Sequence, residues 1–217
     1  MPKQLEFKRV KGWGGKRRGA GRPNKSGRAG HAKRALVDFK KPLHVTLRLI
    51  DKMPNLRTKE FLRHFKTAGL RAKKFNLYLN HYSILGNHIH LIVEARDNHS
   101  LELGMKSLCG RLGKFLRKTQ GGRGAVWLGR FHLHILRTPT EVKRALEYVL
   151  LNRAKHSKLL THLDEFSSGY VFKDWQKLLG RKISPLMKEQ LASNTKMLDE
   201  VSPARSWLLN SGWMRAS

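Results

Sequence analysis

Two histidines one residue apart, His88 and His90, stand in the stretch GNHIHLIVEA (86–95). Neutral imidazole is a common metal ligand in proteins, so a pair on one surface is a candidate site for a divalent cation. Successive side chains of a β-strand point to opposite faces. On a strand over 88–95 both histidines would therefore share one face, about 7 Å apart along the strand, while the apolar residues between and after them would face a core.

The spacing alone is weak evidence, because a chain with 11 histidines in 217 residues contains such pairs by chance. A second pair, His132 and His134, occurs in RFHLHIL. The same alternation turns this pair outward, where it would share a polar sheet face with Thr46 and Arg48. Two interpretations stay open for the histidines: metal ligands, or a strand surface that faces solvent or DNA.

A nucleophile would strengthen the first interpretation, and Tyr148 with Asn152 offers one. The two residues are four apart on a predicted helix over 140–156 and would share one helical face. A phenol is a weak nucleophile at neutral pH, but it becomes useful where a cation polarises the electrophile and positive charge stabilises the phenolate. The alternative is a half-buried helix tyrosine whose hydroxyl meets water.

The elements that must position these residues follow the order β-α-β-β-α-β-α. Hydrophobic periodicity predicts strand 43–50, helix 58–75, strands 77–85 and 88–95, helix 100–119, strand 126–136 and helix 140–156. Thr58 and Thr140 are the predicted N-caps of the first and last helices. This order predicts an α+β fold, a ferredoxin-like sandwich in which helices cover one face of an antiparallel sheet and the other face is free for a ligand.

The composition indicates the class of partner. The formal net charge is +30, from 45 Lys and Arg against 15 Asp and Glu, so a polyanion is expected: nucleic acid first, an anionic membrane second. No apolar run approaches the ~20 residues that a membrane span needs, and we expect no membrane partner. The single cysteine, Cys109, excludes an intrachain disulfide and favours a reducing cytoplasm.

Three regions are predicted. Residues 1–41 hold 14 Lys and Arg against two acids and are rich in glycine, which predicts a disordered basic DNA-binding arm. Residues 42–156 form the predicted catalytic domain. Residues 157–217 are predicted to be a C-terminal extension that packs on the core through Trp175, Trp207 and Trp213.

Basic residues would contact DNA in several places. RRGAGRP (17–23) is a candidate minor-groove hook, and the alternative is a polycation that binds without regard to sequence. Helix 58–75 with Arg57, and residues 105–130, carry cations that would track phosphates, while Trp127, Tyr82 and Phe131 would stack on bases or pack in the core. The predicted DNA contacts are Arg18, Arg22, Arg48, Arg63, Lys66, His132, His134 and Lys155.

Several motifs in this order resemble those of the single-tyrosine HUH endonucleases, and most closely the REP-associated tyrosine transposases. The resemblance covers about residues 42–175. The matching stretches are HVTLR (44–48), His88-Ile89-His90, LRTP (136–139), YVLLN (148–152) and SSGYVFKDW (167–175). Several ordered motifs in one chain are far more specific than a single pair of histidines.

The resemblance implies the HUH endonuclease fold and a role for each site residue. His88 and His90 would hold Mg²⁺ or Mn²⁺, Asn152 would contribute to the metal site, and Tyr148 would be the nucleophile. The implied reaction is cleavage and rejoining of single-stranded, hairpin-bearing DNA through a 5′-phosphotyrosine, without a nucleotide cofactor. The implied location is the bacterial cytoplasm, in association with the nucleoid, and the protein would be a monomer or a homodimer.

The chain departs from the family's pattern in its long basic lead and in the second pair, His132 and His134. Two rival functions remain open. One is a non-catalytic DNA- or RNA-binding protein that keeps the fold, which the net charge of +30 would equally support. The other is a replication or conjugation initiator, which the short length and the lack of a helicase motif disfavour.

Overall fold

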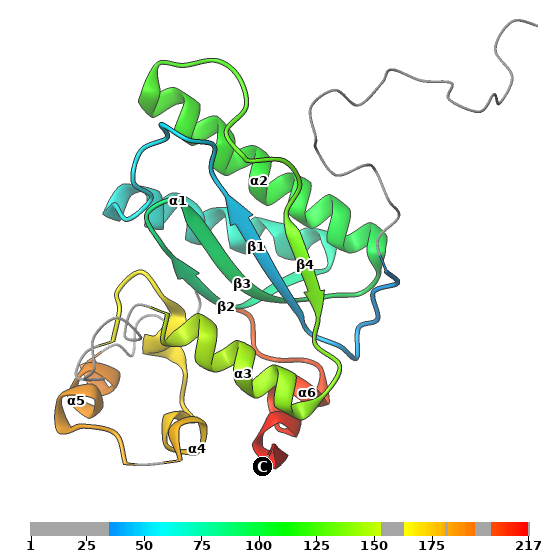
Figure 1. The fold of residues 1–217 in the computed structure, drawn as a ribbon, viewed down its shortest axis with the longest axis vertical. Coiled ribbons are helices and arrows are strands. Elements are labelled where there is room, and N and C mark those ends of the chain that lie inside the picture. The colour runs from blue at the N-terminus through cyan, green and yellow to red at the C-terminus, as the bar shows by residue number, and fades with distance from the viewer. Residues whose placement is uncertain (1–34, 153–162, 181, 194–200, 217) are drawn as a thin grey trace, which may run out of the picture. The chain divides into compact units, whose positions relative to one another are not determined.

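The four strands form one antiparallel sheet in the order β2-β3-β1-β4. The computed structural model describes residues 35–152, 163–180, 182–193 and 201–216. This strand order, with two helices in the connections, confirms the predicted α+β ferredoxin-like fold (Figure 1). The strands are β1 (Leu43–Arg48), β2 (Leu77–Ile84), β3 (His88–Ala95) and β4 (His132–Ile135).

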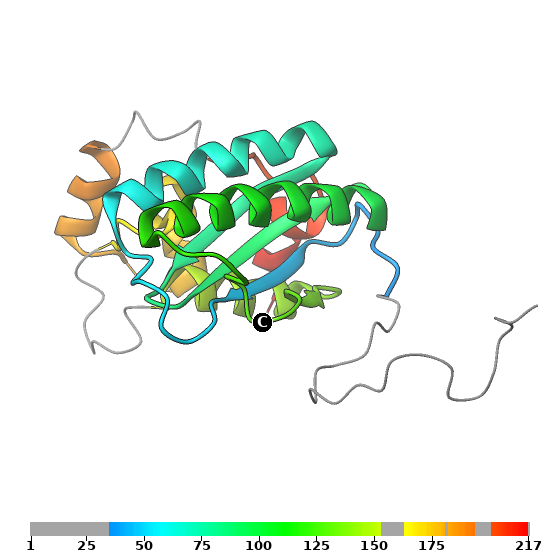
Figure 2. The ribbon, with the colours of Figure 1, turned by 90° about the horizontal axis from the view of Figure 1, so that it is seen from above.

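Helices α1 (Lys59–Ala72) and α2 (Asn98–Gln120) lie side by side on one face of the sheet (Figure 2). Helix α1 begins where predicted, because the Thr58 hydroxyl accepts a hydrogen bond from the Phe61 amide at 3.1 Å. Among the described residues no helix is long and apolar enough to span a bilayer. Alternate strand residues fill the core beneath the helices, namely Leu43, Val45, Leu47, Ile89, Leu91 and Val93.

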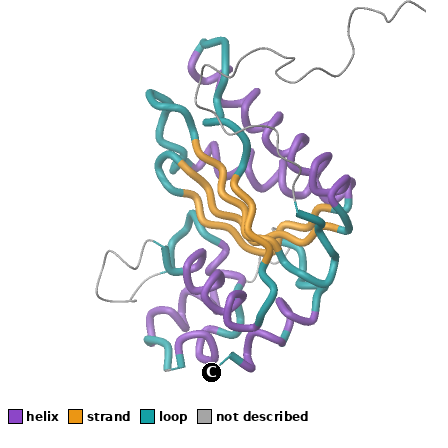
Figure 3. Tube along the Cα trace, turned by 45° about the vertical axis from the view of Figure 1, so that its right-hand side comes forward, coloured by secondary structure: helices purple, strands orange, loops and turns teal. Residues whose placement is uncertain are grey.

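The other face of the sheet is partly covered, which corrects the expectation that it is free. Helix α3 (Pro139–Leu150) and the C-terminal elements lie on the other side of the sheet from α1 and α2 (Figure 3). They enclose a second apolar cluster, in which Ile92 of β3 is fully buried. Trp175 and Trp213 are buried in this cluster, whereas Trp207 is 52% exposed. The C-terminal elements are η3 (Ser168–Val171), α4 (Trp175–Leu179), α5 (Pro185–Ser193), α6 (Trp207–Asn210) and η5 (Gly212–Arg215).

Strand β4 is much shorter than the predicted strand over 126–136. Trp127 makes only an isolated bridge to Leu49, and regular pairing begins again at His132. Gly129 lies between them with φ of 71°, in the left-handed region that interrupts an extended chain. A glycine of this kind leaves the apolar pattern of the segment unchanged, which is why the pattern predicts one continuous strand.

A buried carboxylate fastens the C-terminal segment to the sheet. Glu94 of β3 is 2% exposed, and its oxygens accept hydrogen bonds from the amides of Arg205 at 2.8 Å and Ser206 at 2.7 Å. A third bond comes from Asn80 Nδ2 at 3.1 Å. Asn80 lies where the pairing of β2 with β3 shifts register between Leu79 and His81, and such bulges re-aim a side chain.

We predict that Glu94→Gln lowers the free energy of unfolding by about 1–3 kcal/mol, because its amide nitrogen would face a backbone N–H and leave that buried donor unpaired. Urea unfolding followed by circular dichroism measures the loss. Glu102→Gln, on the exposed side of α2, is the matched control and should change the value by less than about 0.5 kcal/mol. Equal effects in the two variants would contradict the role given to Glu94.

His81 is a second contact between β2 and the C-terminal elements. Its Nδ1 lies 3.3 Å from the Ser168 hydroxyl, and its ring meets Phe172 edge-on with centroids 5.5 Å apart. Burial lowers the pKa of His81 to about 4. The native protein therefore holds this imidazole neutral at a pH where the unfolded chain already binds a proton.

We predict that stability falls as the pH decreases from about 6.5 to about 4, since the unfolded state binds more protons over this window. One such group contributes a slope of up to about 1.4 kcal/mol per pH unit. His81→Gln should reduce, without abolishing, the pH dependence of the unfolding free energy between pH 7 and 4.5, because other buried histidines with lowered pKa values remain. A wild-type slope in His81→Gln would exclude this coupling.

Candidate metal-binding and nucleophile site

The β2–β3 hairpin places His88 and His90 on the face of the sheet opposite α1 and α2. A tight turn over Gly86-Asn87 closes the hairpin: the Leu85 amide donates to the His88 carbonyl at 2.9 Å. Antiparallel pairing sets His90 opposite Thr46, which fixes the face that the histidine shares with β1. The two imidazole centroids lie 4.9 Å apart, with His90 only 5% exposed and His88 half-buried.

Neighbouring side chains hold each ring by its Nδ1 atom. His88 Nδ1 lies 2.7 Å from Asn87 Oδ1, which can only accept a hydrogen bond, so the proton of a neutral His88 belongs on Nδ1. His90 Nδ1 lies 3.1 Å from the Thr46 hydroxyl and 3.3 Å from His44 Nε2. Bonding of one ring nitrogen in this way is how metal-ligating histidines present the other nitrogen.

The environment keeps these imidazoles neutral. Burial, with His44 and His88 nearby, lowers the pKa of His90 to about 3. Burial, followed by the positive charge of Arg48, lowers the pKa of His88. Burial, with His134 and His132 nearby, lowers the pKa of His44 to about 4. At neutral pH each ring therefore has a lone pair, which is the form that binds a cation.

Helix α3 carries Tyr148. An N-cap fixes where the helix begins, and buried apolar residues fix which side of it packs on the protein. Thr138 is the N-cap: its hydroxyl accepts from the Glu141 amide at 3.2 Å, and the Glu141 carboxylate accepts from the Thr138 amide at 3.3 Å. The predicted N-cap Thr140 is therefore wrong, because Pro139 occupies the first helical position and moves the start two residues earlier. The helix packs through Val142, Leu146 and Val149, which are fully buried.

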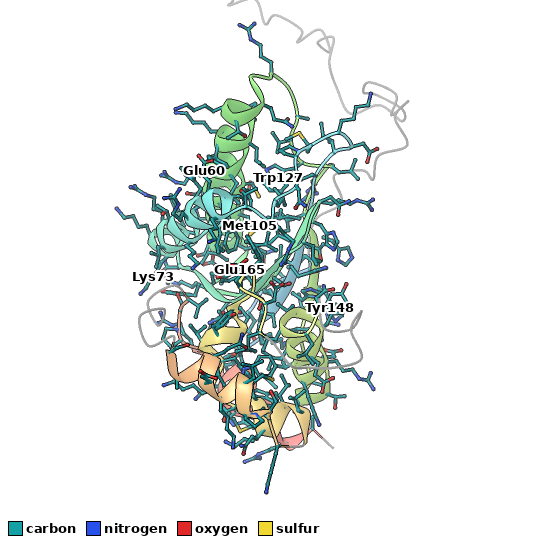
Figure 4. All side chains as sticks on the ribbon, turned by 90° about the vertical axis from the view of Figure 1, so that its left-hand side faces the viewer. Glu60, Lys73, Met105, Trp127, Tyr148 and Glu165 are labelled. Carbon is teal, nitrogen blue, oxygen red and sulfur yellow. The ribbon has the colours of Figure 1, made fainter. Side chains whose placement is uncertain are left out.

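Tyr148 meets the histidines across the open part of the sheet face. Its hydroxyl lies 3.4 Å from His90 Nε2, and its ring meets the His90 ring edge-on with centroids 4.8 Å apart. The phenol ring is also 5.7 Å from the His44 ring, and the side chain is 37% exposed. In Figure 4, Tyr148 lies on the opposite side of the sheet from Glu60 of α1 and from Lys73 of the short helix η1 (Lys73–Phe75).

Asn152 lies beyond the end of the helix, so the expectation that it shares a helical face with Tyr148 is wrong. Helix α3 ends at Leu150, where Leu151 takes a non-helical conformation and donates its amide to the Glu147 carbonyl at 3.0 Å. Asn152 Nδ2 is buried without a hydrogen-bond partner in the described residues. A flip of this amide would put its oxygen at the position that lacks a partner.

The described residues fit a site for a divalent cation that rests on two imidazoles. Within them no group of three or more His, Cys, Asp and Glu side chains is arranged to hold a metal ion. The remaining donors would have to be an amide such as Asn152, water or a ligand oxygen. Imidazole with oxygen donors suits Mn²⁺, and oxygen-rich coordination suits Mg²⁺.

The predicted DNA contacts divide into three groups. Arg48, His132 and His134 are exposed on the site's own face of the sheet, with Arg48 opposite His88 and His132 opposite Thr46. Arg63 and Lys66 belong to α1, on the opposite face. Arg18, Arg22 and Lys155 lie outside the described residues.

The packing decides between the two alternatives left open for Trp127, Tyr82 and Phe131, in favour of the core, and it corrects the expectation for Arg57. Tyr82 is 1% exposed in the core and cannot stack on a base. Trp127 is partly buried and donates its indole N–H to the Cys109 carbonyl at 3.1 Å, and Phe131 is partly buried against the core. Arg57 is held by Asp164 in two hydrogen bonds of 2.7 and 2.8 Å, so it is not available to track phosphates. The sequence pattern gives the burial of none of them.

His44 is the site residue that sequence reasoning missed. It contacts both His90 and Tyr148, whereas in the sequence it is only the first residue of the HVTLR stretch (44–48). The available signal was its position two residues before Thr46 on a strand of alternating polarity, which puts both on one face. Only the pairing of β1 with β3 shows that this face is the one that carries the histidine pair.

The comparisons with known proteins bear on the fold. No protein-family profile matches the chain, and no curated protein matches it. A solved structure of a REP-associated tyrosine transposase bound to a REP hairpin is similar, with a TM-score of 0.53 and 17% identity over 73% of this chain and 90% of that one. A candidate transposase from Deinococcus radiodurans gives a TM-score of 0.37 and 15% identity, over 60% and 93% of the two chains. The resemblance to REP-associated tyrosine transposases is thus confirmed for the fold.

We predict that Thr138→Ala lowers the free energy of unfolding by about 1 kcal/mol, because it removes the hydroxyl that caps the helix bearing Tyr148. Thr140→Ala, two residues inside the helix, is the matched control and should have a much smaller effect. Thermal unfolding of both variants measures the difference. A larger loss of unfolding free energy in Thr140→Ala than in Thr138→Ala would show that Thr140 is the N-cap, as the sequence predicts.

Proposed function

We propose that this protein is a transposase-like endonuclease and strand transferase that cleaves hairpin-bearing single-stranded DNA through a 5′-phosphotyrosine at Tyr148. The observation that carries the proposal is the 3.4 Å approach of the Tyr148 hydroxyl to His90 Nε2, beside His88. A candidate nucleophile and two neutral imidazoles meet on one open surface. The similar fold of a transposase bound to a REP hairpin supports the same conclusion.

In the proposed reaction the Tyr148 oxygen loses its proton and attacks the scissile phosphorus. The bond from phosphorus to the 3′ oxygen breaks, the departing oxygen takes a proton, and the strand leaves as a free 3′-OH. The 5′ end stays attached to Tyr148. Attack by the 3′-OH of a second strand on this ester reverses the step and joins the DNA, so no nucleotide cofactor is consumed.

His88 and His90 would hold the cation, with Asn152 as the proposed third protein donor. A bound Mg²⁺ or Mn²⁺ would polarise the phosphate and stabilise its developing negative charge. The side chains contribute the rest: burial keeps the imidazoles neutral, and the buried apolar side of α3 sets the direction from which Tyr148 approaches.

The surrounding cations would bind the DNA strand. Arg48, His132 and His134 flank the site on its own face and are the proposed contacts near the scissile phosphate. The basic arm would add salt-dependent affinity from a chain of net charge +30. We further infer a cytoplasmic, nucleoid-associated protein acting as a monomer or a homodimer.

A non-catalytic nucleic-acid-binding protein with this fold is the alternative. It would need the positive charge and the sheet surface, but not a tyrosine against neutral histidines. Substitutions of Tyr148 and His88 therefore distinguish the two functions, whereas substitutions of the basic residues do not.

We predict that the wild-type protein forms a covalent adduct with labelled hairpin DNA in the presence of Mn²⁺, seen as a band of reduced mobility on a denaturing gel. Tyr148→Phe should form none while keeping its affinity for the DNA. His88→Ala should reduce adduct formation at least about 100-fold while keeping most of the salt-dependent binding, because the lost ligand contributes to catalysis.

Arg63→Ala, on the opposite face of the sheet, controls for the general loss of positive charge and should still form the adduct. No adduct with wild type under any divalent cation, together with normal DNA binding, would favour the non-catalytic function. An adduct with Tyr148→Phe would exclude Tyr148 as the nucleophile. Loss of both adduct and binding in His88→Ala would indicate a structural role for that histidine.

A further inference from the structure

We propose that His44 is a positioning residue which, together with Thr46, selects the tautomer of His90 and so makes His90 Nε2 the nitrogen with the free lone pair. The inference rests on the proposed function, in which His90 is a metal ligand. His44 would act through His90, without touching the cation or the DNA.

The geometry brings two side chains of β1 to one atom of β3. His44 and Thr46 are two residues apart and so share a face, and Thr46 lies directly opposite His90. The Thr46 hydroxyl is 3.1 Å from His90 Nδ1, and His44 Nε2 is 3.3 Å from the same atom. The His44 and His90 rings are tilted by 35° with centroids 5.4 Å apart.

A neutral imidazole carries one N–H, so the placement of that proton decides which nitrogen can bind a cation. With the proton on His90 Nδ1, the Thr46 oxygen and the His44 Nε2 lone pair both accept it, and His90 Nε2 presents its lone pair toward Tyr148. With the proton on Nε2, no lone pair faces that side. His44 and His90 are thus coupled, because the proton between them belongs to only one of the two facing nitrogens.

His44 and Thr46 are the side chains that can accept a hydrogen bond from His90 Nδ1. In metal sites the second nitrogen of a ligating histidine commonly donates to a carboxylate or a backbone carbonyl. Within the described part of the chain no carboxylate is hydrogen-bonded to His90 or His44, and the hydrogen bonds of His90 go to Thr46, His44 and Tyr148. A hydroxyl and an imidazole therefore stand where a carboxylate is usual.

His44 has a second contact that links the two halves of the site. Its ring meets the Tyr148 ring edge-on at 5.7 Å, while Tyr148 also contacts His90 at 4.8 Å. The three rings form a triangle, so a change at His44 reaches both the ligand and the nucleophile. This placement distinguishes His44 from Thr46, whose hydroxyl contacts His90 and no other side chain of the described residues.

The test is the tautomer of His90 in the full-length protein, read from long-range ¹H–¹⁵N spectra of histidine-labelled samples at pH 7.5. The expected wild-type signal is a protonated Nδ1 and an unprotonated Nε2. His44→Leu, which has no acceptor, should convert His90 to a mixture of tautomers, and Thr46→Val should do so in part. His44→Gln, whose amide oxygen can still accept, should restore the wild-type signal.

A second readout is the affinity for Mn²⁺ alone, measured by electron paramagnetic resonance. His44→Leu should weaken binding about 10- to 100-fold, the range for loss of a residue that supports a ligand. His44→Gln should stay within about threefold of wild type. His64→Leu, on α1, is the control for removal of an exposed histidine, and circular dichroism shows whether each variant is folded.

Protonation of Nε2 in wild-type His90 would overturn the proposal, as would an unchanged tautomer and an unchanged Mn²⁺ affinity in His44→Leu. Failure of His44→Gln to restore either signal would mean that His44 acts by packing and not as an acceptor, which also overturns it. A wild-type protein that shows the expected tautomer dependence but forms no covalent DNA adduct would refute the proposed function and leave the positioning role intact.

Discussion

The antiparallel pairing of β1 with β3 is the interaction on which the candidate site depends. Its register puts Thr46 opposite His90 and Arg48 opposite His88, and it puts apolar partners such as Leu47 and Ile89 opposite one another on the other face. A slip of one residue would exchange the two faces. Burial of the apolar residues beneath α1 and α2 fixes the register of the two strands. The same register fixes which polar side chains lie opposite one another on the other face.

Burial among other neutral or cationic groups explains the chemistry that this face can support. The chain has a net charge of +30, and an additional proton on His90 or His44 would be both desolvated and repelled. The same conditions that disfavour the imidazolium favour a lone pair for a divalent cation. Neutral imidazoles of this kind are what the proposed cation site requires.

The second apolar cluster decides where Tyr148 lies. Helix α3 packs through Val142, Leu146 and Val149, and its cluster includes Ile92 of β3 together with Trp175 and Trp213 from the C-terminal elements. Glu94 ties residues 205 and 206 to the end of the same strand. The C-terminal elements therefore do more than cover the sheet: they hold the helix that presents the phenol to the histidines.

The sequence by itself determined the order of elements and the shared sheet face of each histidine pair, because both follow from local periodicity. It misplaced the cap of α3 and the helical position of Asn152, since helix ends depend on a few local contacts that periodicity does not contain. The burial of Tyr82, the ion pair of Arg57 with Asp164 and the role of His44 were decided by tertiary structure alone. Each rests on a contact between residues far apart in the chain, which spacing along the sequence cannot specify.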